Sequence, residues 1–337
     1  MLNKIKEDSA LKFSKVLLIA PEFYTYHNDL FNAFKKISEQ VVFYSEMNQT
    51  TLYRLSGRLS QSLKKRLEKK HIEGLLTLSE NEKFDAVFVV RGVCLTPDIL
   101  TTLKNNIPNA PFYLYQWDSY QQNDYRALIP SFDSISTFDF KDAEELRLRY
   151  QPLFYSDVYR DICLLKEDKL YDLVFYGAYH SDRLKIIKHF QKLLCEQGLV
   201  FKSHLYIKKI PLFFRLLKGE ISFSDLRFFK TYSVSANEIA QSYSKTKAVL
   251  DIELSIQSGL SIRTFEVLGS GVKLVTTNAN VVKEAFYNPA QIMVIDRNAI
   301  KADLSFFESS SSDCDVKCYH IDAWLEKILE STQLESN

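Results

Sequence analysis

The feature that most constrains the fold is an alternation of short apolar runs with stretches of helical periodicity. The apolar runs are rich in Val, Ile, Leu and Phe, as are the buried strands of a parallel sheet. Strands that alternate with helices predict a doubly wound α/β fold, in which ligands bind beyond the carboxyl ends of the strands. The runs lie at 15–21, 41–44, 86–90, 112–115 and 134–138, and again at 171–176, 248–253, 272–276 and 292–295.

The alternation is interrupted once, at residues 150–159, which show no clean period. A chain of 337 residues is long enough for two domains, each with its own core. We therefore predict an N-terminal Rossmann-like domain at 1–152 and a second at 153–320. A separate C-terminal helix is predicted at 321–337, with an amphipathic pattern that contains Trp324.

Composition excludes several classes of protein. A hydrophobic content of 46% and a charged content of 25% are typical of a soluble globular chain. The net charge of +1 gives no general attraction for nucleic acid, so no nucleic-acid partner is expected. The first residues lack the apolar core of a signal peptide, and no run is long enough to span a bilayer, so we expect a cytoplasmic protein.

The five cysteines are scattered and odd in number, which favours reduced thiols. Cys314, Cys318 and His320 lie close in sequence, but three ligands in a serine-rich loop make a weak metal site. Asp251 and Glu253 resemble the metal-binding acidic pair of GT-A enzymes only superficially, and we interpret them as the polar end of a strand. No metal is therefore expected.

Residues 258–278 combine a polar turn, a helix, a glycine stop and a buried strand. Ser258, Gly259 and Ser261 supply flexible backbone and hydroxyl oxygens that can cap the helix. A helix that begins beside a strand end is a potential anion site, because its first N–H groups are free and its dipole is positive there.

The helix in this stretch carries Arg263 and Glu266, which are three residues apart and share a face. An arginine can clamp a phosphate, and a carboxylate can accept two sugar hydroxyls. The alternative is a surface salt bridge on a packing helix. Gly269 and Gly271 are expected to end the helix, because glycine adopts left-handed backbone angles without strain.

Further candidates lie where four other predicted strands end. Gly177 and Arg183 flank a turn between a strand and a helix, which is a plausible phosphate-binding corner, although an arginine there can also point into solvent. In the first half, His27 and Asp118 follow strands and could activate an acceptor hydroxyl. Equally, His27 could cap a helix or pack on neighbouring tyrosines, and Asp118 could be a structural turn residue. Arg91 and Gly92 end a third strand at the same predicted edge.

The segment from Arg263 to Asn278 resembles the C-terminal signature of GT-B glycosyltransferases, especially the CgeB-like branch near family 4. That resemblance implies two Rossmann-like α/β domains facing a central cleft, with the C-terminal helix crossing back to the first domain. It implies that Glu266 holds donor-sugar hydroxyls, and that Arg183, Gly177, Arg263 and the Ser258–Ser261 loop meet the diphosphate. Family 4 enzymes usually carry a second glutamate eight positions earlier, where this chain has Ser258.

The function implied is transfer of a sugar from a nucleotide-diphosphate sugar, with a UDP-sugar favoured, to a glycan or lipid-linked acceptor in cell-envelope polysaccharide or lipopolysaccharide synthesis. CgeB-like proteins have an aspartate similar to Asp118. The donor is a substrate, so no cofactor is expected, and no metal is needed because arginines and helix termini neutralise the diphosphate. The alternatives are a nucleotide-sugar epimerase and a non-catalytic binding protein with the same fold.

Two basic segments suggest peripheral contact with the inner membrane face. Leu52–His71 has leucines every four residues, which predicts one amphipathic helix with a basic face. Residues 202–230 mix basic residues with phenylalanines. The alternatives are a solvated charged face for the first segment and an insertion that packs its own rings for the second.

Overall fold

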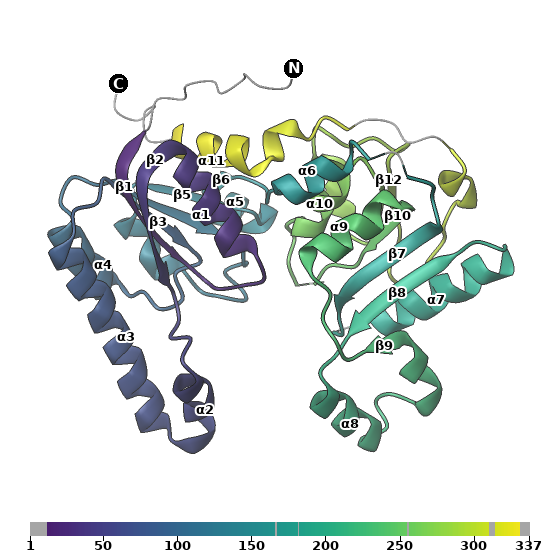
Figure 1. Ribbon diagram of the computed structural model, residues 1–337, viewed down its shortest axis with the longest axis horizontal. Coiled ribbons are helices and arrows are strands. Elements are labelled where there is room, and N and C mark those ends of the chain that lie inside the picture. The colour runs from purple at the N-terminus through teal and green to yellow at the C-terminus, as the bar shows by residue number, and fades with distance from the viewer. Residues whose placement is uncertain (1–11, 166, 181, 255, 310–313, 331–337) are drawn as a thin grey trace. The chain divides into compact units, whose positions relative to one another are not determined.

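The computed structural model describes residues 12–165, 167–180, 182–254, 256–309 and 314–330 (Figure 1). The chain divides into two compact units. Unit 1 comprises Met1–Pro152 and Trp324–Asn337, and unit 2 comprises Leu153–Ala323. Among the described residues, no helix is both long and apolar enough to cross a bilayer.

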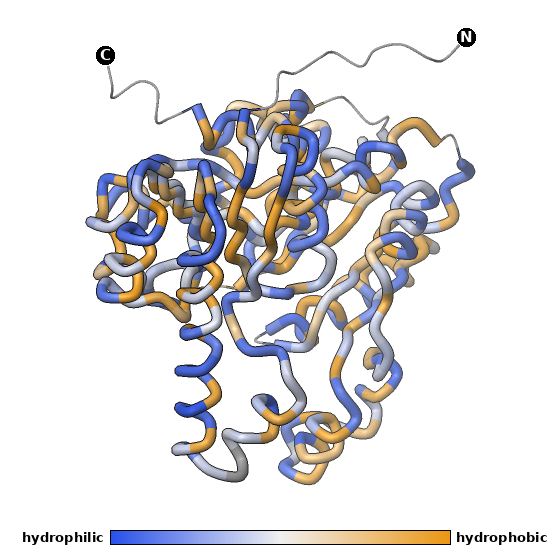
Figure 2. The backbone as a smooth tube through the Cα atoms, turned by 60° about the vertical axis from the view of Figure 1, so that its left-hand side comes forward, coloured by the Kyte–Doolittle hydropathy of each residue, from blue (hydrophilic) through white to orange (hydrophobic). Residues whose placement is uncertain are grey.

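Unit 1 is built on a six-stranded sheet in the order β2-β1-β3-β4-β5-β6, in which all neighbouring strands are parallel. Hydrophobic residues follow the central strands (Figure 2), and every residue of β3 and β4 is buried. The strands are β1 (Phe13–Ala20), β2 (Ser38–Ser45), β3 (Ala86–Val90), β4 (Phe112–Gln116), β5 (Ser134–Thr137) and β6 (Arg149–Tyr150), and the helices are α1 (Tyr26–Ile37), α2 (Thr51–Leu59), α3 (Gln61–Asn81), α4 (Pro97–Asn106) and α5 (Phe140–Leu146).

Unit 2 is built on a second six-stranded parallel sheet, in the order β12-β11-β10-β7-β8-β9. Helices flank this sheet as they flank the first (Figure 1). The strands are β7 (Tyr171–Ala178), β8 (Phe201–Tyr206), β9 (Phe229–Lys230), β10 (Thr246–Asp251), β11 (Lys273–Thr276) and β12 (Ile292–Val294), and the helices are α6 (Asp157–Ile162), α7 (Arg183–Glu196), α8 (Lys209–Leu217), α9 (Ala236–Ser244) and α10 (Ile262–Gly269). The predicted α/β class with two Rossmann-like units is confirmed.

The last helix, α11 (Ile321–Glu330), runs from unit 2 into unit 1. Trp324 is fully buried in unit 1, and its Nε1 donates to the Pro152 carbonyl oxygen at 2.8 Å. Its ring lies 4.7 Å from the Tyr115 ring and 6.5 Å from the Phe88 ring. Trp324 is therefore a core residue of the sheet formed by the first half of the chain.

The prediction of a single helix over Leu52–His71 is wrong, because the helix is interrupted at Ser60. Ser60 is extended, its N–H donates to the Ser56 carbonyl at the end of α2, and its hydroxyl accepts from the Leu63 N–H at the start of α3. The four-residue leucine repeat therefore does not form one continuous stripe. Leu55 is exposed, whereas Leu63 is only partly so.

The interpretation of residues 202–230 as an insertion is also wrong for its two ends. Phe201–Tyr206 is strand β8 and pairs with β7, and Phe229–Lys230 is strand β9 at the sheet edge. Phe228 and Phe229 are buried in the unit 2 core. Only the middle of the segment, which contains α8, lies outside the sheet.

Gly269 serves a different purpose from the one predicted for it. It is the last residue of α10, and a Cβ atom built on it would lie 2.4 Å from the Tyr155 ring, so it permits close packing. The left-handed residue that follows the helix is Gly271, with φ of 69°.

Gly269→Ala is expected to destabilise unit 2 by about 3 kcal/mol, because the ring cannot give way without disturbing its buried neighbours. Urea denaturation measures the change. Gly57→Ala is the matched control, since Gly57 lies in α2 with its nearest neighbouring atom at 3.8 Å, and it should be neutral or slightly stabilising. An equal effect of both substitutions would show that the Tyr155 contact is unimportant.

Candidate functional site

The carboxyl ends of the unit 2 strands carry a cluster of charged side chains. Asp251 ends β10 and Glu253 follows it, while Arg297 comes shortly after β12. His180 and Asp182 lie between β7 and α7. Because all these strands are parallel, the side chains meet at one edge of the sheet.

Asp251 joins this edge to the first turn of α10. Its carboxylate is fully buried, and its Oδ2 accepts hydrogen bonds from the Ser261 hydroxyl at 2.6 Å and the Thr264 hydroxyl at 3.2 Å. Arg263 Nη1 lies 3.5 Å from Asp251 Oδ1. The predicted cap at Ser261 is therefore corrected: Ser261 occupies the N-cap position, but its hydroxyl donates to Asp251 instead of accepting from the helix.

A second group is centred on Arg297, whose side chain is 15% exposed. Its Nη2 donates to Glu253 Oε1 at 2.6 Å and to the Thr277 hydroxyl at 3.1 Å. Its Nη1 donates to Asp182 Oδ1 at 2.8 Å. The Thr277 hydroxyl in turn donates to Glu253. These bonds hold the segments after β7, β10, β11 and β12 together.

Arg183 is buried at the start of α7 and bonds to the backbone. Its Nε donates to the Ile252 carbonyl at 2.9 Å and its Nη1 to the Ala178 carbonyl at 2.8 Å. A Cβ atom on Gly177 would lie 2.9 Å from Arg183 Nη1, so Gly177 makes room for the guanidinium. The two predicted residues thus meet, but the bonds described brace β7 against the segment after β10. Contact with phosphate stays a prediction for both.

The loop before α10 is held by two asparagines that the sequence reading did not single out. Asn278 Nδ2 donates to the Gly259 carbonyl and Asn280 Nδ2 to the Ser258 carbonyl, both at 2.9 Å. Ser258 and Gly259 are buried. This arrangement fixes the backbone of the loop beside the first turn of α10.

Glu266 is 4% exposed and lies one helical turn beyond Arg263. Both residues act electrostatically on Tyr243 of α9, whose pKa is raised mainly by burial, lowered by Arg263 and raised by Glu266. The surface salt bridge considered as an alternative does not describe this face of α10, because Glu266 is buried and Arg263 pairs with Asp251.

The pKa of His180 reflects the charges at this edge of the sheet. Its pKa is lowered to about 4, first by burial and then by the positive charges of Arg183, Arg297 and Arg263. The same three guanidinium groups contact Asp251, Ile252 and Glu253 at the end of β10, so they gather at one edge of the sheet. Carboxylates at 182, 251 and 253 form ion pairs with Arg263 and Arg297 and compensate part of this positive charge.

This lowered pKa predicts a pH dependence of stability. The ordinary histidine pKa is about 6.5, so between pH 4 and 6.5 the unfolded chain holds a proton at His180 that the folded chain does not. The free energy of unfolding should therefore fall as pH drops through this window. His180→Gln should flatten that part of the profile in urea titrations at several pH values, and an unchanged slope would contradict the assignment.

Unit 1 has its own charged group at the carboxyl ends of β2, β3 and β4. Arg91, between β3 and α4, forms ion pairs with the fully buried Glu46 and with Asp118, whose Oδ2 lies 3.5 Å from Arg91 Nη1. Burial raises the pKa of Asp118, and Arg91 opposes that shift. Arg91 and Gly92 both have left-handed backbone angles, with φ of 70° and 72°. Such strain in a non-glycine residue is uncommon and concentrates at functional sites.

A cavity of about 270 Å³ adjoins this group and extends towards α2 and α3. Its lining combines Glu46 and Cys94 with Tyr53, Glu68 and His71. Tyr53 donates to Glu68 at 2.8 Å, so the polar side chains of the wall are partly bonded to one another. The lining therefore combines polar and apolar side chains.

His27 lies in the first turn of α1, and its ring packs 5.6 Å from the Phe43 ring. This contact replaces the tyrosine packing considered for it. Among the described residues, no hydrogen-bond partner meets its buried Nδ1. The Phe23 and Trp117 rings lie 6.4 Å apart, which brings the loop before α1 close to the loop that carries Asp118.

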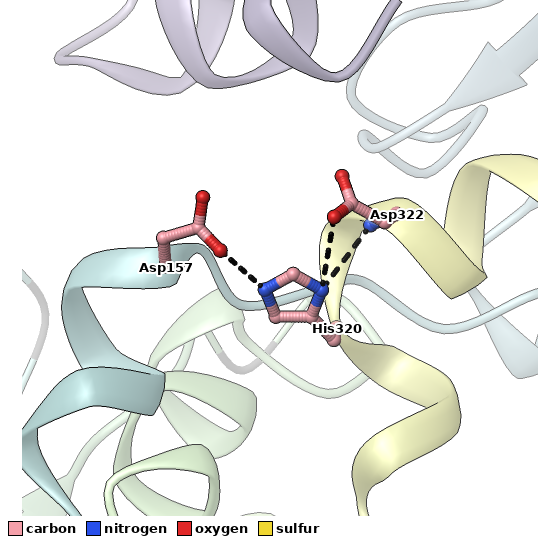
Figure 3. A group of neighbouring side chains, drawn as sticks. All are labelled: Asp157, His320 and Asp322. Atoms are coloured by element: carbon pink, nitrogen blue, oxygen red, sulfur yellow. Dashed lines mark hydrogen bonds and ion pairs between the residues drawn. The ribbon is translucent and has the colours of Figure 1, made fainter. Parts of the chain in front are cut away.

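A third polar group lies in unit 2 at the start of α11 (Figure 3). His320 Nε2 lies 2.9 Å from Asp157 Oδ1, and its Nδ1 lies 3.4 Å from the Asp322 backbone nitrogen. The spacing of Asp157, His320 and Asp322 would suit a cation. Arg160 Nη1, however, lies 2.7 Å from Asp157 Oδ1 and 3.4 Å from His320 Nε2, so a guanidinium already supplies positive charge there. We therefore interpret Asp157, His320 and Asp322 as residues that hold the start of α11 against α6.

Solved structures share the architecture. The Anabaena protein HepE in complex with UDP and glucose is 10% identical, with a TM-score of 0.60 over 95% of this chain and 100% of that one. The chain has the GT-B fold. The lipopolysaccharide outer core galactosyltransferase WaaB is 11% identical, with a TM-score of 0.53 over 95% of this chain and 99% of that one.

The GT-B fold is also shared by an enzyme of another kind. The UDP-GlcNAc 2-epimerase from Methanocaldococcus jannaschii is 10% identical, with a TM-score of 0.53 over 95% of this chain and 99% of that one. No protein-family model and no curated protein matches the sequence. At these identities the likeness establishes the fold alone.

Sequence reasoning did not single out Glu46, Asp182, Thr277 and Arg297, and it interpreted Asp251 and Glu253 only as the polar end of a strand. The signal available for Asp251 and Glu253 was their position at the end of the predicted strand 248–253, and for Glu46 it was its position shortly after the predicted strand 41–44. Arg297 stands in a polar loop, and only the parallel pairing of β11 with β12 brings it to Glu253.

Proposed function

We propose that the chain is a metal-independent glycosyltransferase whose unit 2 binds a nucleotide-diphosphate sugar, with a UDP-sugar favoured. The observation that carries the proposal is that Arg263, Arg183 and Arg297 contact Asp251, Ile252 and Glu253, respectively, at the carboxyl end of β10. The fold supports it, because HepE was solved with UDP and glucose, and WaaB is named as a lipopolysaccharide galactosyltransferase. The acceptor proposed is a glycan or lipid-linked sugar of the cell envelope.

In this proposal the diphosphate binds at the first turn of α10, which carries Arg263. The Arg263 side chain is 19% exposed, so its guanidinium can exchange its loose 3.5 Å contact with Asp251 for phosphate oxygens. Backbone N–H groups and the helix dipole add to the attraction. Arg297 and the buried Arg183 lie at the same end of the sheet, where Asp182 and Glu253 compensate part of the positive charge. Charge that develops on the departing diphosphate is stabilised by the same groups.

Glu266 is proposed to accept hydrogen bonds from donor-sugar hydroxyls, while the Ser258–Ser261 loop lets the backbone approach the ligand. On unit 1, Asp118 or His27 is proposed to take the proton from the acceptor hydroxyl. The raised pKa of Asp118 suits this role, since a base is most effective when its pKa approaches the working pH. The acceptor oxygen then bonds to the anomeric carbon as the bond to the diphosphate breaks.

The first test is the thermal stability of the protein with UDP, GDP, CMP, ADP and TDP. A ligand that binds the folded state raises the melting temperature by mass action. We expect a selective rise with one nucleotide, with UDP favoured. A flat response to all five would contradict the donor site and favour a non-catalytic protein. That alternative arises because this chain has Ser258 where family 4 enzymes usually have a glutamate.

The epimerase is the second candidate, favoured by the shared fold with the Methanocaldococcus enzyme. Product analysis separates the two reactions once the nucleotide is known. An epimerase converts the nucleotide sugar without an acceptor and leaves the bond to the diphosphate intact in its final product. A transferase releases the nucleotide diphosphate and requires acceptor for rapid turnover.

A further inference from the structure

Helix α8 is apolar on two opposite sides. Leu212 and Leu216 face inward and pack against the unit 2 core. Four further apolar side chains, at the i, i+3, i+4 and i+7 positions, are more than half exposed. They are Ile210 (71% exposed), Phe213 (57%), Phe214 (55%) and Leu217 (68%). Helices that are hydrophobic all round are normally buried, so the outer stripe is a surface suited to a partner.

Helix α8 lies in the connection between β8 and the edge strand β9, and Figure 1 draws it away from the sheet. Phe223, in the short helix that follows, is 81% exposed. The Phe213 and Phe214 rings contact each other edge to face at 5.8 Å. Large rings held in this way add apolar area at low cost in conformational entropy.

Basic residues stand at both ends of the stripe. Lys208 and Lys209 precede it and Lys218 follows it, and all three are exposed. Within the part of the chain that the structure describes, none of these ammonium groups forms an ion pair. Arg215 is the exception among the basic residues of α8, because it pairs with Glu220 at 2.6 Å. The rim of the stripe therefore carries uncompensated positive charge.

We infer that α8 is a docking surface for an anionic lipid bilayer. Phenylalanine and leucine side chains can enter the boundary between headgroups and acyl chains while lysines remain at the headgroup level. Each basic residue near an anionic surface adds to the attraction. A protein partner fits less well, because lysine is depleted from protein interfaces.

The other basic segment is less suited to this role. In α3, Lys64 lies 3.7 Å from Glu68 and Lys69 lies 3.8 Å from Glu73, so part of its charge is compensated. Leu52 and Leu55 of α2 are about half exposed, but the break at Ser60 separates them from the basic face. We therefore place the lipid contact on α8 and not on Leu52–His71.

The experiment is flotation of the full chain with vesicles of phosphatidylglycerol mixed into phosphatidylcholine, compared with phosphatidylcholine alone. Wild-type protein should bind the anionic vesicles, and less so at high salt, where surface charges are screened. Phe213→Ser/Phe214→Ser should lower the partition coefficient on the order of a hundredfold, because two large rings no longer enter the bilayer. Lys208→Gln/Lys209→Gln should lower it on the order of tenfold.

The matched control is Leu164→Ser/Leu165→Ser, an adjacent pair of exposed apolar residues in the same unit. It should bind vesicles like wild type, and circular dichroism melts should show that all variants are folded. Equal binding to both vesicle types, or unchanged binding of the phenylalanine variant, would overturn the inference. So would an absence of binding together with a phenylalanine-dependent dimer in light scattering, which would assign the stripe to a second copy of the chain. Vesicle binding needs no donor sugar, so this test stands apart from that of the transferase proposal.

Discussion

Arg263→Ala is expected to weaken binding of the nucleotide diphosphate about a hundredfold, since a charge-assisted hydrogen bond contributes roughly 1.5–3 kcal/mol and two can form to phosphate. Its side chain is 19% exposed and belongs to the first turn of α10, where the helix dipole favours an anion. Isothermal titration calorimetry with the nucleotide selected by the thermal screen gives the affinity. Arg263→Lys should keep part of it, because the charge remains but the planar fork does not.

The control for this substitution is Arg126→Ala. Arg126 also pairs with an aspartate, Asp124 at 2.7 Å, but both side chains are 55% exposed on the surface of unit 1. Its removal should leave nucleotide affinity unchanged. Because Arg263→Ala removes a partner of the buried Asp251, its melting temperature without nucleotide is measured as well. Full affinity in a folded Arg263→Ala variant would contradict the proposed diphosphate site.

Trp324→Ala is expected to have the largest effect on stability, with a loss of about 3–5 kcal/mol in unit 1. The side chain is fully buried among aromatic rings and donates a hydrogen bond to Pro152. The chain has two tryptophans, so the variant retains Trp117, whose fluorescence reports unfolding of unit 1 in urea.

Trp324→Phe separates the contribution of the buried aromatic ring from that of the hydrogen bond to Pro152. It retains an aromatic ring in the core but loses the N–H group that reaches the Pro152 carbonyl, so its cost should be smaller, about 1–3 kcal/mol. Unit 2 serves as the internal reference, because its stability should not change in either variant. A Trp324→Ala variant as stable as wild type would show that α11 is not part of the unit 1 core.

The strands were predictable because buried parallel strands are continuous apolar runs. Ala86–Val90 and Phe112–Gln116 are of this kind, and both are completely buried. Strand β8 was missed because its sequence, FKSHLY, mixes polar residues with apolar ones near the sheet edge. The break at Ser60 was missed because the leucine repeat continues through it, and only the capping role of the serine marks the boundary.

The candidate site, like the fold, was predictable only where the signal is local in sequence. Helix α10 and the residues on it follow from local sequence, since periodicity and polar turn residues are local signals. The ion pairs of Glu253 with Arg297 and of Glu46 with Arg91 join residues 44 and 45 positions apart. Such pairs depend on the order of the strands in the sheet, which periodicity does not specify. The predicted Arg183 was found where expected, but its bonds to backbone carbonyls could not be foreseen from residue type.

The placement of Trp324 has a consequence for synthesis of the protein on the ribosome. The sheet of unit 1 is translated first, yet its core is completed by a side chain that emerges only after all of unit 2. Unit 2, whose residues are continuous in sequence, can therefore mature while the first sheet still lacks its final helix. A nascent chain that stalls before residue 324 would hold unit 1 with an unfilled apolar surface, and this is the stage at which we expect it to depend most on chaperones.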